Sequence, residues 1–327
     1  MNCYESAPEP YASLMRYPHI LSIILYSLAF RALCKKQNEN FHSFSRLLLW
    51  HTIGSFVSQM YFSFLALPVS YLPYPVYRSA GVFMYLDVPG VLVMNLELIL
   101  ITHSALSTIE LLRFRLEAAR PDRSKFDPIK VLVYLFRLNL IVIFLYLTSS
   151  TPHAIEKQKE YKFQFSQAYP SLPVSNLIQC PNVFIFPPIT DNQYMTSLVS
   201  MCSVTTTTLF LVVISVITIP FRIRALKKTA SKKTIEVQKM FFVSVFLQAI
   251  INSLFFIFPV SEFLKFAIGN ELTDGGHFQL VLILMPYHGT AATIIMICFT
   301  RPIRDSITGT FTTGKVASAK SISRTMA

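Results

Sequence analysis

Apolar residues along the chain gather in long segments, and polar and charged residues fall in the short stretches between them. A helix needs roughly 20 apolar residues to cross about 30 Å of hydrocarbon. The segments that reach this length cover about residues 17–34, 47–69, 82–110, 130–149, 197–220, 240–262 and 278–299. They lack the alternation of barrel strands. The pattern therefore predicts an all-α membrane protein, with a seven-transmembrane helix bundle in residues 1–299.

Composition supports a membrane protein and argues against other classes. The 327 residues are 53% hydrophobic and only 14% charged, whereas soluble domains contain about a quarter charged residues. A formal net charge of +12 is compatible with nucleic-acid binding, but the basic residues lie between apolar segments and not along one soluble face. We therefore expect the lipid bilayer as a partner, and no nucleic acid.

Lys and Arg are unequally divided between the two sets of loops. The loops after the first, third and fifth segments, together with the tail 300–327, contain 22 of them. The N-terminus and the remaining loops contain six. Because basic residues stay on the cytoplasmic side, the N-terminus is predicted outside and the tail in the cytoplasm.

The most basic of these loops is FRIRALKKTASKKTIEVQKMFF, residues 221–242, which carries seven Lys or Arg. Anionic lipid attracts such a run by about 1 kcal/mol per basic residue near the surface. Membrane anchoring is one interpretation, and contact with a cytoplasmic partner is another. The two are compatible, and both stay open.

Several stretches resemble the nematode serpentine chemoreceptors of class H or the related class I. SKKTIEVQKMFFVSVFLQAIINSLFFIFP is similar to that superfamily's entry into span six, and PYHGTAATIIMICFTRPIRDSI to its span seven. ALPVSYLPYPVYRSAGVF and SLPVSNLIQCPNVFIF are similar to its outer loops, and IELLRFR resembles the exit of span three. One departure is Ile303, which replaces the Tyr of a Pro-Tyr-Arg motif.

The resemblance implies a G-protein-coupled chemosensory receptor. Such a receptor binds a small environmental chemical in an outer helix-bundle cavity and signals through a heterotrimeric G protein. It also implies a multi-pass protein of the plasma membrane, in the sensory cilium of chemosensory neurons. The alternative is a membrane transporter of a small solute, although the odd number of spans and only 9 Gly speak against it. The chain has neither Gly-x-Ser-x-Gly nor His-Glu-x-x-His, so we expect neither an enzyme nor a cofactor.

Charged residues within the spans are candidates for a conformational switch. Glu97 lies mid-span, where an ionised carboxylate is costly unless it has a partner or meets water. Arg137, inside span four, either extends to the cytoplasmic surface or pairs with Glu97. The resemblance adds Pro259 of span six. For Glu97, a purely structural hydrogen bond remains the alternative to a switch role.

Two further residues are candidates for the ligand cavity. Asp87 lies near the outer end of span three, and His288 lies near the middle of span seven beside Gly289. A solvated helix end and a packed histidine are the alternative interpretations. The histidines do not lie at metal-ligand spacing with each other or with a cysteine, so no metal site is predicted.

Basic residues next to spans six and seven are candidates for G-protein coupling. They are Arg222, Arg224, Lys227, Lys228, Arg301 and Arg304. On the opposite side of the membrane, Cys3 and Cys180 both lie where oxidation can occur. A disulfide that ties the N-terminus to the second outer loop is one expectation, and two free thiols are the other.

Overall fold

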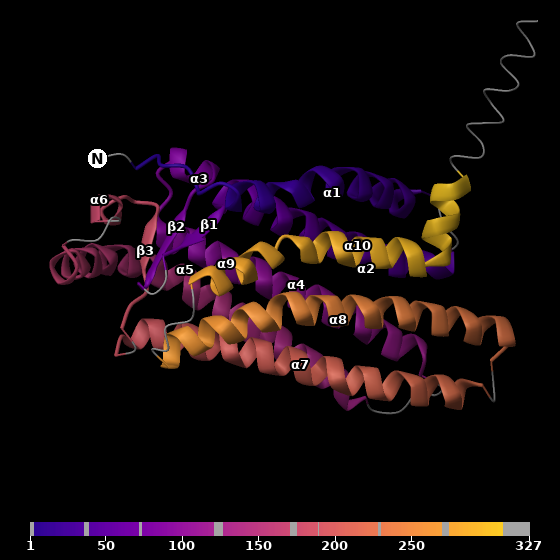
Figure 1. The fold of residues 1–327 in the computed structure, drawn as a ribbon. Helices are drawn as coiled ribbons and strands as arrows, with labels where there is room; N and C mark the ends of the chain where they lie inside the picture. Colours follow the sequence, from indigo (N-terminus) through magenta and orange to yellow (C-terminus); the bar gives the residue numbers. More distant parts are fainter. Residues whose placement is uncertain are drawn as a thin grey trace, which may run out of the picture.

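The protein is described by a computed structural model that covers residues 3–35, 39–71, 74–120, 127–170, 175–188, 190–227, 230–269 and 275–309. Within these ranges a few side chains lie outside the description, including those of Pro259 and residues 262–278. Long helices run side by side and form a bundle, with small elements gathered at the end that carries the N-terminus (Figure 1). The long helices are α1 (Tyr11–Cys34), α2 (Glu39–Met60), α4 (Gly90–Ala118), α5 (Pro128–Ala168), α7 (Asn192–Leu226), α8 (Lys232–Gly269), and α9 (Gly275–Leu284) followed by α10 (Tyr287–Phe299).

Six helical segments in the described residues are long and apolar enough to cross a membrane. The seventh spanning element is α2, which continues as the π-helix η1 (Tyr61–Ala66). It is less apolar because it carries polar side chains such as His51, Ser55 and Gln59, which are buried inside the bundle. The seven-helix bundle predicted from the sequence is therefore the fold of this chain.

The helices differ from the predicted spans mainly at their ends. Residues 82–85 form a separate short helix, α3, and α4 begins only at Gly90. The last span is divided between α9 and α10, which meet at Met285 and Pro286. Beyond it, residues 301–309 of the predicted tail form a further helix. Hydropathy finds the apolar stretch, but local backbone contacts decide where a helix begins and breaks.

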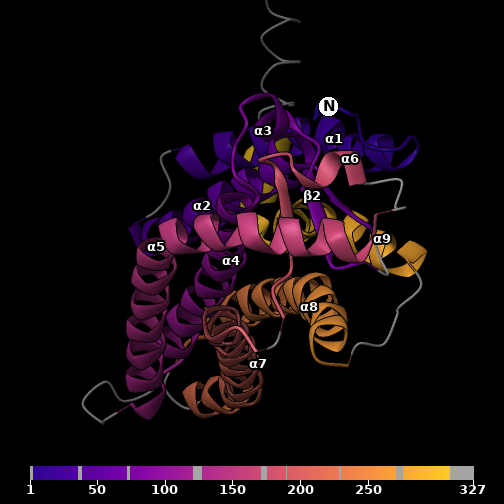
Figure 2. The same ribbon diagram turned by 90° about the vertical axis from the view of Figure 1, so that its left-hand side faces the viewer.

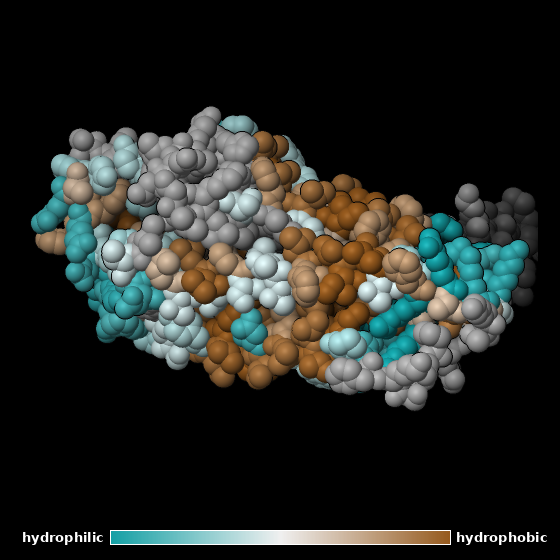
Figure 3. Space-filling view, turned by 90° about the horizontal axis from the view of Figure 1, so that it is seen from below, coloured by the Kyte–Doolittle hydropathy of each residue, from teal (hydrophilic) through white to brown (hydrophobic). Residues whose placement is uncertain are grey.

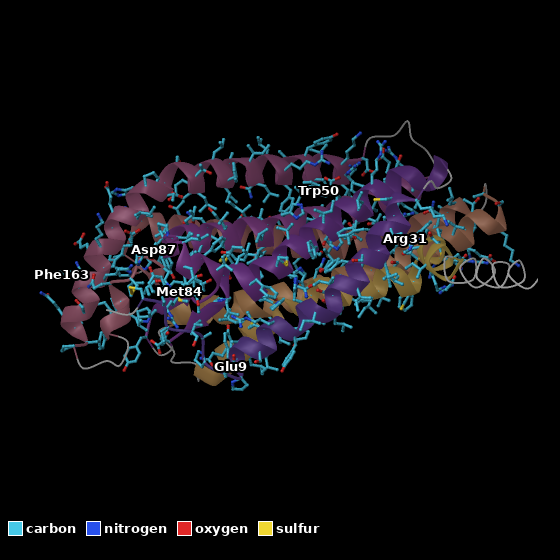
Figure 4. All side chains as sticks on the ribbon, turned by 90° about the horizontal axis from the view of Figure 1, so that it is seen from above. Glu9, Arg31, Trp50, Met84, Asp87 and Phe163 are labelled. Carbon is cyan, nitrogen blue, oxygen red and sulfur yellow. A yellow bond between two sulfur atoms is a disulfide. The ribbon has the colours of Figure 1, made fainter. Side chains whose placement is uncertain are left out.

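Helix α5 continues about 19 residues beyond the predicted span and changes direction on the way. Its second half lies across the end of the bundle in Figures 1 and 2. Phe163 of this half, 59% exposed, lies beyond the bundle end in Figure 4. Pro152 lies inside the helix, and a proline removes one backbone hydrogen bond and commonly causes such a bend.

A small antiparallel sheet, which hydropathy did not predict, closes the N-terminal end. Its order is β1 (Pro68–Ser70), β2 (Val76–Ser79) and β3 (Val183–Ile185). In the register, Val69 faces Arg78 and Tyr77 faces Phe184. Gly90 fits α4 against this sheet, because a Cβ there would lie 2.8 Å from the carbonyl carbon of Val183. The sheet thus joins the first outer loop to the second and to the start of α4.

The outer surface of the bundle carries an apolar belt. Leu138 and Leu145 of α5 and Phe210 of α7 are each more than half exposed. In Figure 3 brown residues fill the middle of the visible face, between teal residues at the two ends. Glu9 and Arg31, labelled in Figure 4, mark the two ends of α1. This distribution is what a chain surrounded by hydrocarbon requires.

Candidate functional site

Cys3 and Cys180 form a disulfide at the N-terminal end, which we call the outer end. Cys180 follows the short helix α6 (Ser175–Ile178) and belongs to a small apolar cluster with Val76, Phe165 and Val183. The bond therefore ties the N-terminus to the loop that leads into β3. Of the two alternatives left open by the sequence, the structure contains the disulfide.

The second half of α5 holds β3 in place. The Gln158 side chain donates to the Ile185 carbonyl at 2.8 Å and accepts from the Ile185 N–H at 2.9 Å, so it continues the hydrogen bonding of the sheet. One turn further, the Lys162 ammonium donates to the Cys180 carbonyl at 2.6 Å. Burial lowers the pKa of Lys162 to about 8. The disulfide, the sheet and α5 thus form one connected outer layer.

A cavity lies beneath this layer, between α4, α5 and α7. Together with the open space at its mouth, its volume is about 1200 Å³. Most of its lining is apolar, and its polar lining groups come from β2, α4, α5 and the start of α7. The described residues that line it include Tyr77, Met94, Asn95, Glu97, Leu98, Leu147, Ala154, Lys157, Tyr161, Phe184, Phe186, Asp191, Tyr194, Leu198 and Met285. A concave, mostly apolar space with a few placed polar groups is the usual form of a small-molecule site.

Glu97 is the buried carboxylate of this cavity, with 8% of its surface exposed. It lies on α4 and accepts a hydrogen bond from the Tyr77 hydroxyl of β2 at 3.0 Å. Within the described part of the chain it makes no ion pair. The partner of Glu97 is thus a tyrosine from the outer sheet, which the sequence analysis did not identify.

The other charged lining groups form a closed network. Lys157 of α5 pairs with Asp191 at 2.7 Å, and the Tyr161 hydroxyl donates to the same carboxylate oxygen at 2.6 Å. Asp191 also caps α7 by accepting from the Tyr194 N–H at 2.8 Å. Burial alone would raise the pKa of Asp191, but the hydrogen bonds from Lys157, Tyr161 and Tyr194 outweigh it and lower the pKa to about 2.

The two ligand candidates from the sequence do not line the cavity. Asp87 lies in the turn between α3 and α4 with a positive φ of 49°, and its side chain is exposed (Figure 4). His288 is fully buried, and its Nδ1 lies 2.7 Å from the Met285 carbonyl oxygen. Both positions agree with the alternative interpretations, a solvated turn and a packed histidine.

At the opposite, cytoplasmic end, Arg137 does not reach Glu97. Instead its guanidinium pairs with Glu110 of α4, and Nε donates at 2.7 Å. Arg113 donates to the other Glu110 oxygen at 2.8 Å. The alternative that Arg137 pairs with Glu97 is therefore wrong in this structure. Arg137 pairs instead with Glu110, which lies nearer to it on α4. Glu110 ties α4 to α5.

Arg115, one turn further along α4, is a functional candidate that the sequence analysis missed. Its side chain is 3% exposed, and its guanidinium carbon lies 3.5 Å from the ring centre of Phe44 and 4.2 Å from that of Phe241. Its Nε and one terminal nitrogen have no hydrogen-bond acceptor among the described residues. Arg115 thus connects α2, α4 and α8 through aromatic contacts. The signal was its place in IELLRFR, the stretch that resembles the exit of span three.

The basic coupling candidates fall into two groups. Arg222 is partly buried and donates to the Leu116 carbonyl at 2.9 Å and to Asp127 at 3.2 Å, so it joins α7 to the end of α4 and to the residue that caps α5. Burial would raise the pKa of Asp127, but hydrogen bonds from Arg222 and the Ile129 N–H lower it. The side chains of the second group are exposed: Arg224, Lys227, Arg301 and Arg304. Lys228 lies outside the described residues, as does the side chain of Pro259, whose backbone is part of α8.

Comparison with known proteins adds the family. The family model described as "Serpentine type 7TM GPCR chemoreceptor Srh" matches residues 6–313, almost the whole chain. The chain belongs to the Srh family. Its class is therefore the nematode serpentine receptor class H, one of the two classes that the sequence resembled. No curated protein and no solved structure matches the chain at a significant level.

Membership in the Srh family means that the cavity and the cytoplasmic contacts belong to a protein of a receptor family. The Srh family is a family of G-protein-coupled chemoreceptors with seven membrane spans, and not a class of enzymes. The chain is thus a multi-pass membrane protein of a receptor family. Within it, α4 contacts α2, α5, α7 and α8, as well as β2 and β3. The Srh bundle is therefore built around α4, which carries Glu97 at one end and Arg115 at the other.

Proposed function

We propose that this Srh receptor binds a small environmental chemical in the outer cavity and activates a heterotrimeric G protein at its cytoplasmic end. Glu97 and Arg115 lie on one continuous helix, about 27 Å apart at 1.5 Å per residue, and this observation carries the proposal. A ligand that moves α4 at the cavity moves the groups that hold α5 and α8 at the other end. The family assignment favours this receptor over the transporter considered above.

The contacts of Arg115 at the cytoplasmic end are the part of the receptor that would differ between its inactive and active states. Arg115 is a buried cation between two rings, and two of its nitrogens lack an acceptor in the part of the chain that the structure describes. A buried charged group without hydrogen-bond partners is costly. If α8 moves away with Phe241, Arg115 becomes accessible to an acceptor outside the chain. In this proposal, aromatic contacts with Arg115 hold α8 in the inactive arrangement. A ligand activates the receptor by shifting the equilibrium toward the arrangement in which α8 has moved away.

Exposed basic side chains form the surface where the partner would bind. Arg224 and Lys227 lie at the end of α7, and Arg301 and Arg304 lie on the helix after α10. Basic residues at this surface attract both anionic lipid and an acidic partner surface. By the resemblance to the nematode chemoreceptors, we propose that the receptor lies in the plasma membrane, in the sensory cilium of chemosensory neurons.

The test is a G-protein activation assay in cells that express the full chain, with a panel of volatile and water-soluble compounds. A compound that activates the wild type should lose at least about tenfold in potency with Ala154→Trp, because the indole takes up cavity space that the ligand would occupy. Leu145→Trp is the control, since Leu145 lies on the same helix and is 60% exposed toward lipid.

Surface expression of each variant is measured in parallel. An unchanged response of Ala154→Trp at equal surface expression would contradict binding in this cavity. Ligand binding without G-protein activation, with every G-protein class supplied, would contradict the coupling part of the proposal.

A further inference from the structure

The charges that line the outer cavity are not balanced. Asp191 has Lys157 at 2.7 Å and also accepts from Tyr161. Glu97 has only the Tyr77 hydroxyl at 3.0 Å, and no basic side chain pairs with it among the residues that the structure describes. Because Lys157 is already paired, the described lining contains one carboxylate more than it has cations.

The surroundings of Glu97 prepare it for a cation. Only 8% of its surface is exposed, so water screens its charge weakly. The hydrogen bond from the Tyr77 hydroxyl fixes the orientation of the carboxylate. Glu97 accepts this bond through one oxygen, Oε2. The remaining acceptor capacity of the carboxylate is available to a donor in the cavity.

The rest of the lining suits an organic cation better than a metal ion. Near Glu97 the wall is made of apolar side chains such as Met94 and Leu98, and no group of described residues has the composition of a metal site. The cavity also carries the aromatic rings of Tyr77, Phe184 and Tyr194. Aromatic faces attract ammonium groups, most strongly where water is excluded.

We propose that the ligand class of this receptor is a small protonated amine with an apolar body. Its ammonium donates to Glu97 and lies among the aromatic rings, while its apolar part fills the space toward α7. A neutral ligand of the same shape would leave the Glu97 charge unmatched, and an anionic ligand would be repelled. This inference rests on the proposed function, because it assigns a ligand class to the same cavity.

The experiment measures thermal stabilisation of the purified full-length protein in detergent at neutral pH by matched compounds. The probes are 2-phenylethylamine and hexylamine, and their neutral counterparts are 2-phenylethanol and hexan-1-ol. Each pair shares its carbon skeleton, so the difference reports the charge. A bound ligand stabilises the folded state according to its affinity. We expect the amines to bind the wild type about tenfold or more tightly than the alcohols.

Two substitutions assign this preference to Glu97. Glu97→Gln retains an oxygen that can accept from Tyr77 but removes the charge, so the preference for amines should disappear. Glu97→Asp retains the charge and should keep the preference, which covers the case in which the Gln variant does not fold. Glu156→Gln is the matched control, because it removes the same charge from an exposed position on α5 outside the cavity lining.

Three results would overturn the inference: no stabilisation by the amines, equal stabilisation by the alcohols, or an amine preference that persists in Glu97→Gln. The same compounds in the G-protein assay separate the two proposals. Amines that stabilise through Glu97 but activate no G protein would leave the ligand class standing and contradict the coupling. Activation by neutral compounds only, blocked by Ala154→Trp, would support the proposed function and contradict the ligand class.

Discussion

The two ends of the bundle are held together by different kinds of contact. At the outer end, the Cys3–Cys180 disulfide and the three-stranded sheet link the elements through a covalent bond and backbone pairing, and the Gln158 side chain extends this pairing to α5. At the cytoplasmic end, the side chains of Glu110 and Arg115 link the helices. Glu110 joins α4 to α5, and Arg115 packs between α2 and α8.

This difference indicates that the outer layer is rigid and that the contacts at the cytoplasmic end can rearrange. Strand pairing is specified by register and cannot shift slightly without losing several hydrogen bonds. A side-chain pair can be broken singly and replaced by another partner at a modest cost. We therefore expect the outer layer to hold the cavity in shape, and the cytoplasmic contacts to exchange when the receptor changes state.

The largest effect is expected from removing the disulfide. Cys3→Ser should lower the free energy of unfolding by about 2–4 kcal/mol, because the bond ties chain segments 177 residues apart. It should also weaken amine binding, since the loop after Cys180 leads into β3, which pairs with the Tyr77 strand. Thermal melts of purified protein and surface expression measure the first effect.

Cys298→Ser serves as the control for that experiment, because Cys298 is an exposed free thiol. If Cys3→Ser melts at the same temperature as the wild type and reaches the surface equally well, the outer layer does not depend on the covalent link. The contrast between the two ends would then be weaker than we propose.

A smaller effect on the fold, but a large one on signalling, is expected from Arg115→Met. Methionine keeps an apolar stem between Phe44 and Phe241 but removes the guanidinium. Loss of a cation–π contact of about 2 kcal/mol is offset by removal of a buried charge, two of whose nitrogens have no acceptor among the described residues. We expect a melting temperature close to that of the wild type, and G-protein activation reduced by about tenfold or more.

Arg224→Met is the comparison for this prediction, because Arg224 is exposed at the end of α7. It should change signalling less than Arg115→Met does. Wild-type activation by Arg115→Met at equal surface expression would show that Arg115 only supports packing, and that the movable part lies elsewhere.

The smallest effect concerns pH and the outer end alone. Hydrogen bonds from Lys157, Tyr161 and Tyr194 overcome the effect of burial and hold the pKa of Asp191 at about 2, below its ordinary value of 3.8. Since the folded protein releases this proton more readily, the network stabilises the fold above about pH 4. That stability is lost as the pH falls toward 2. Asp191→Asn should therefore show a shallower fall in melting temperature over this range.

Asp127 also has a lowered pKa and titrates in both proteins, so the difference between their melting curves isolates Asp191. Parallel curves for Asp191→Asn and the wild type would mean that the Lys157–Asp191 pair contributes nothing measurable to the outer layer.

Much of the fold could be predicted because hydropathy is a local property. Each spanning helix corresponds to about 20 successive apolar residues, and the division of Lys and Arg between the loops predicts the orientation in the membrane. The exceptions have local structural causes that hydropathy does not contain. Gly90 donates its N–H to the Pro181 carbonyl at 2.9 Å and so begins α4 against the second outer loop. Pro152 accompanies the bend that brings α5 over the sheet.

The candidate site was predicted less completely, because its contacts join residues far apart in the sequence. The sequence singled out Glu97 and Arg137, since charges inside apolar segments need partners. It could not supply those partners, which depend on how each helix is rotated about its axis. Rotation placed Tyr77 beside Glu97, and Glu110 beside Arg137. It also turned Arg115 toward Phe44 and Phe241. Asp87 lies outside the cavity because it belongs to the turn between α3 and α4.

By itself, then, the sequence determined that this is a seven-helix membrane protein with a basic cytoplasmic side, and its motifs indicated the chemoreceptor class. Lipid requires each spanning segment to be apolar and to satisfy its own backbone hydrogen bonds. These features can therefore be recognised in one segment without knowing which helices pack against it. Only the tertiary structure decided that Cys3 and Cys180 are joined and that Glu97 lies in a cavity without a basic partner among the described residues. The reason is physical: a pairing between distant residues depends on the packing of the whole bundle, and apolar segments of similar hydropathy can pack in many ways.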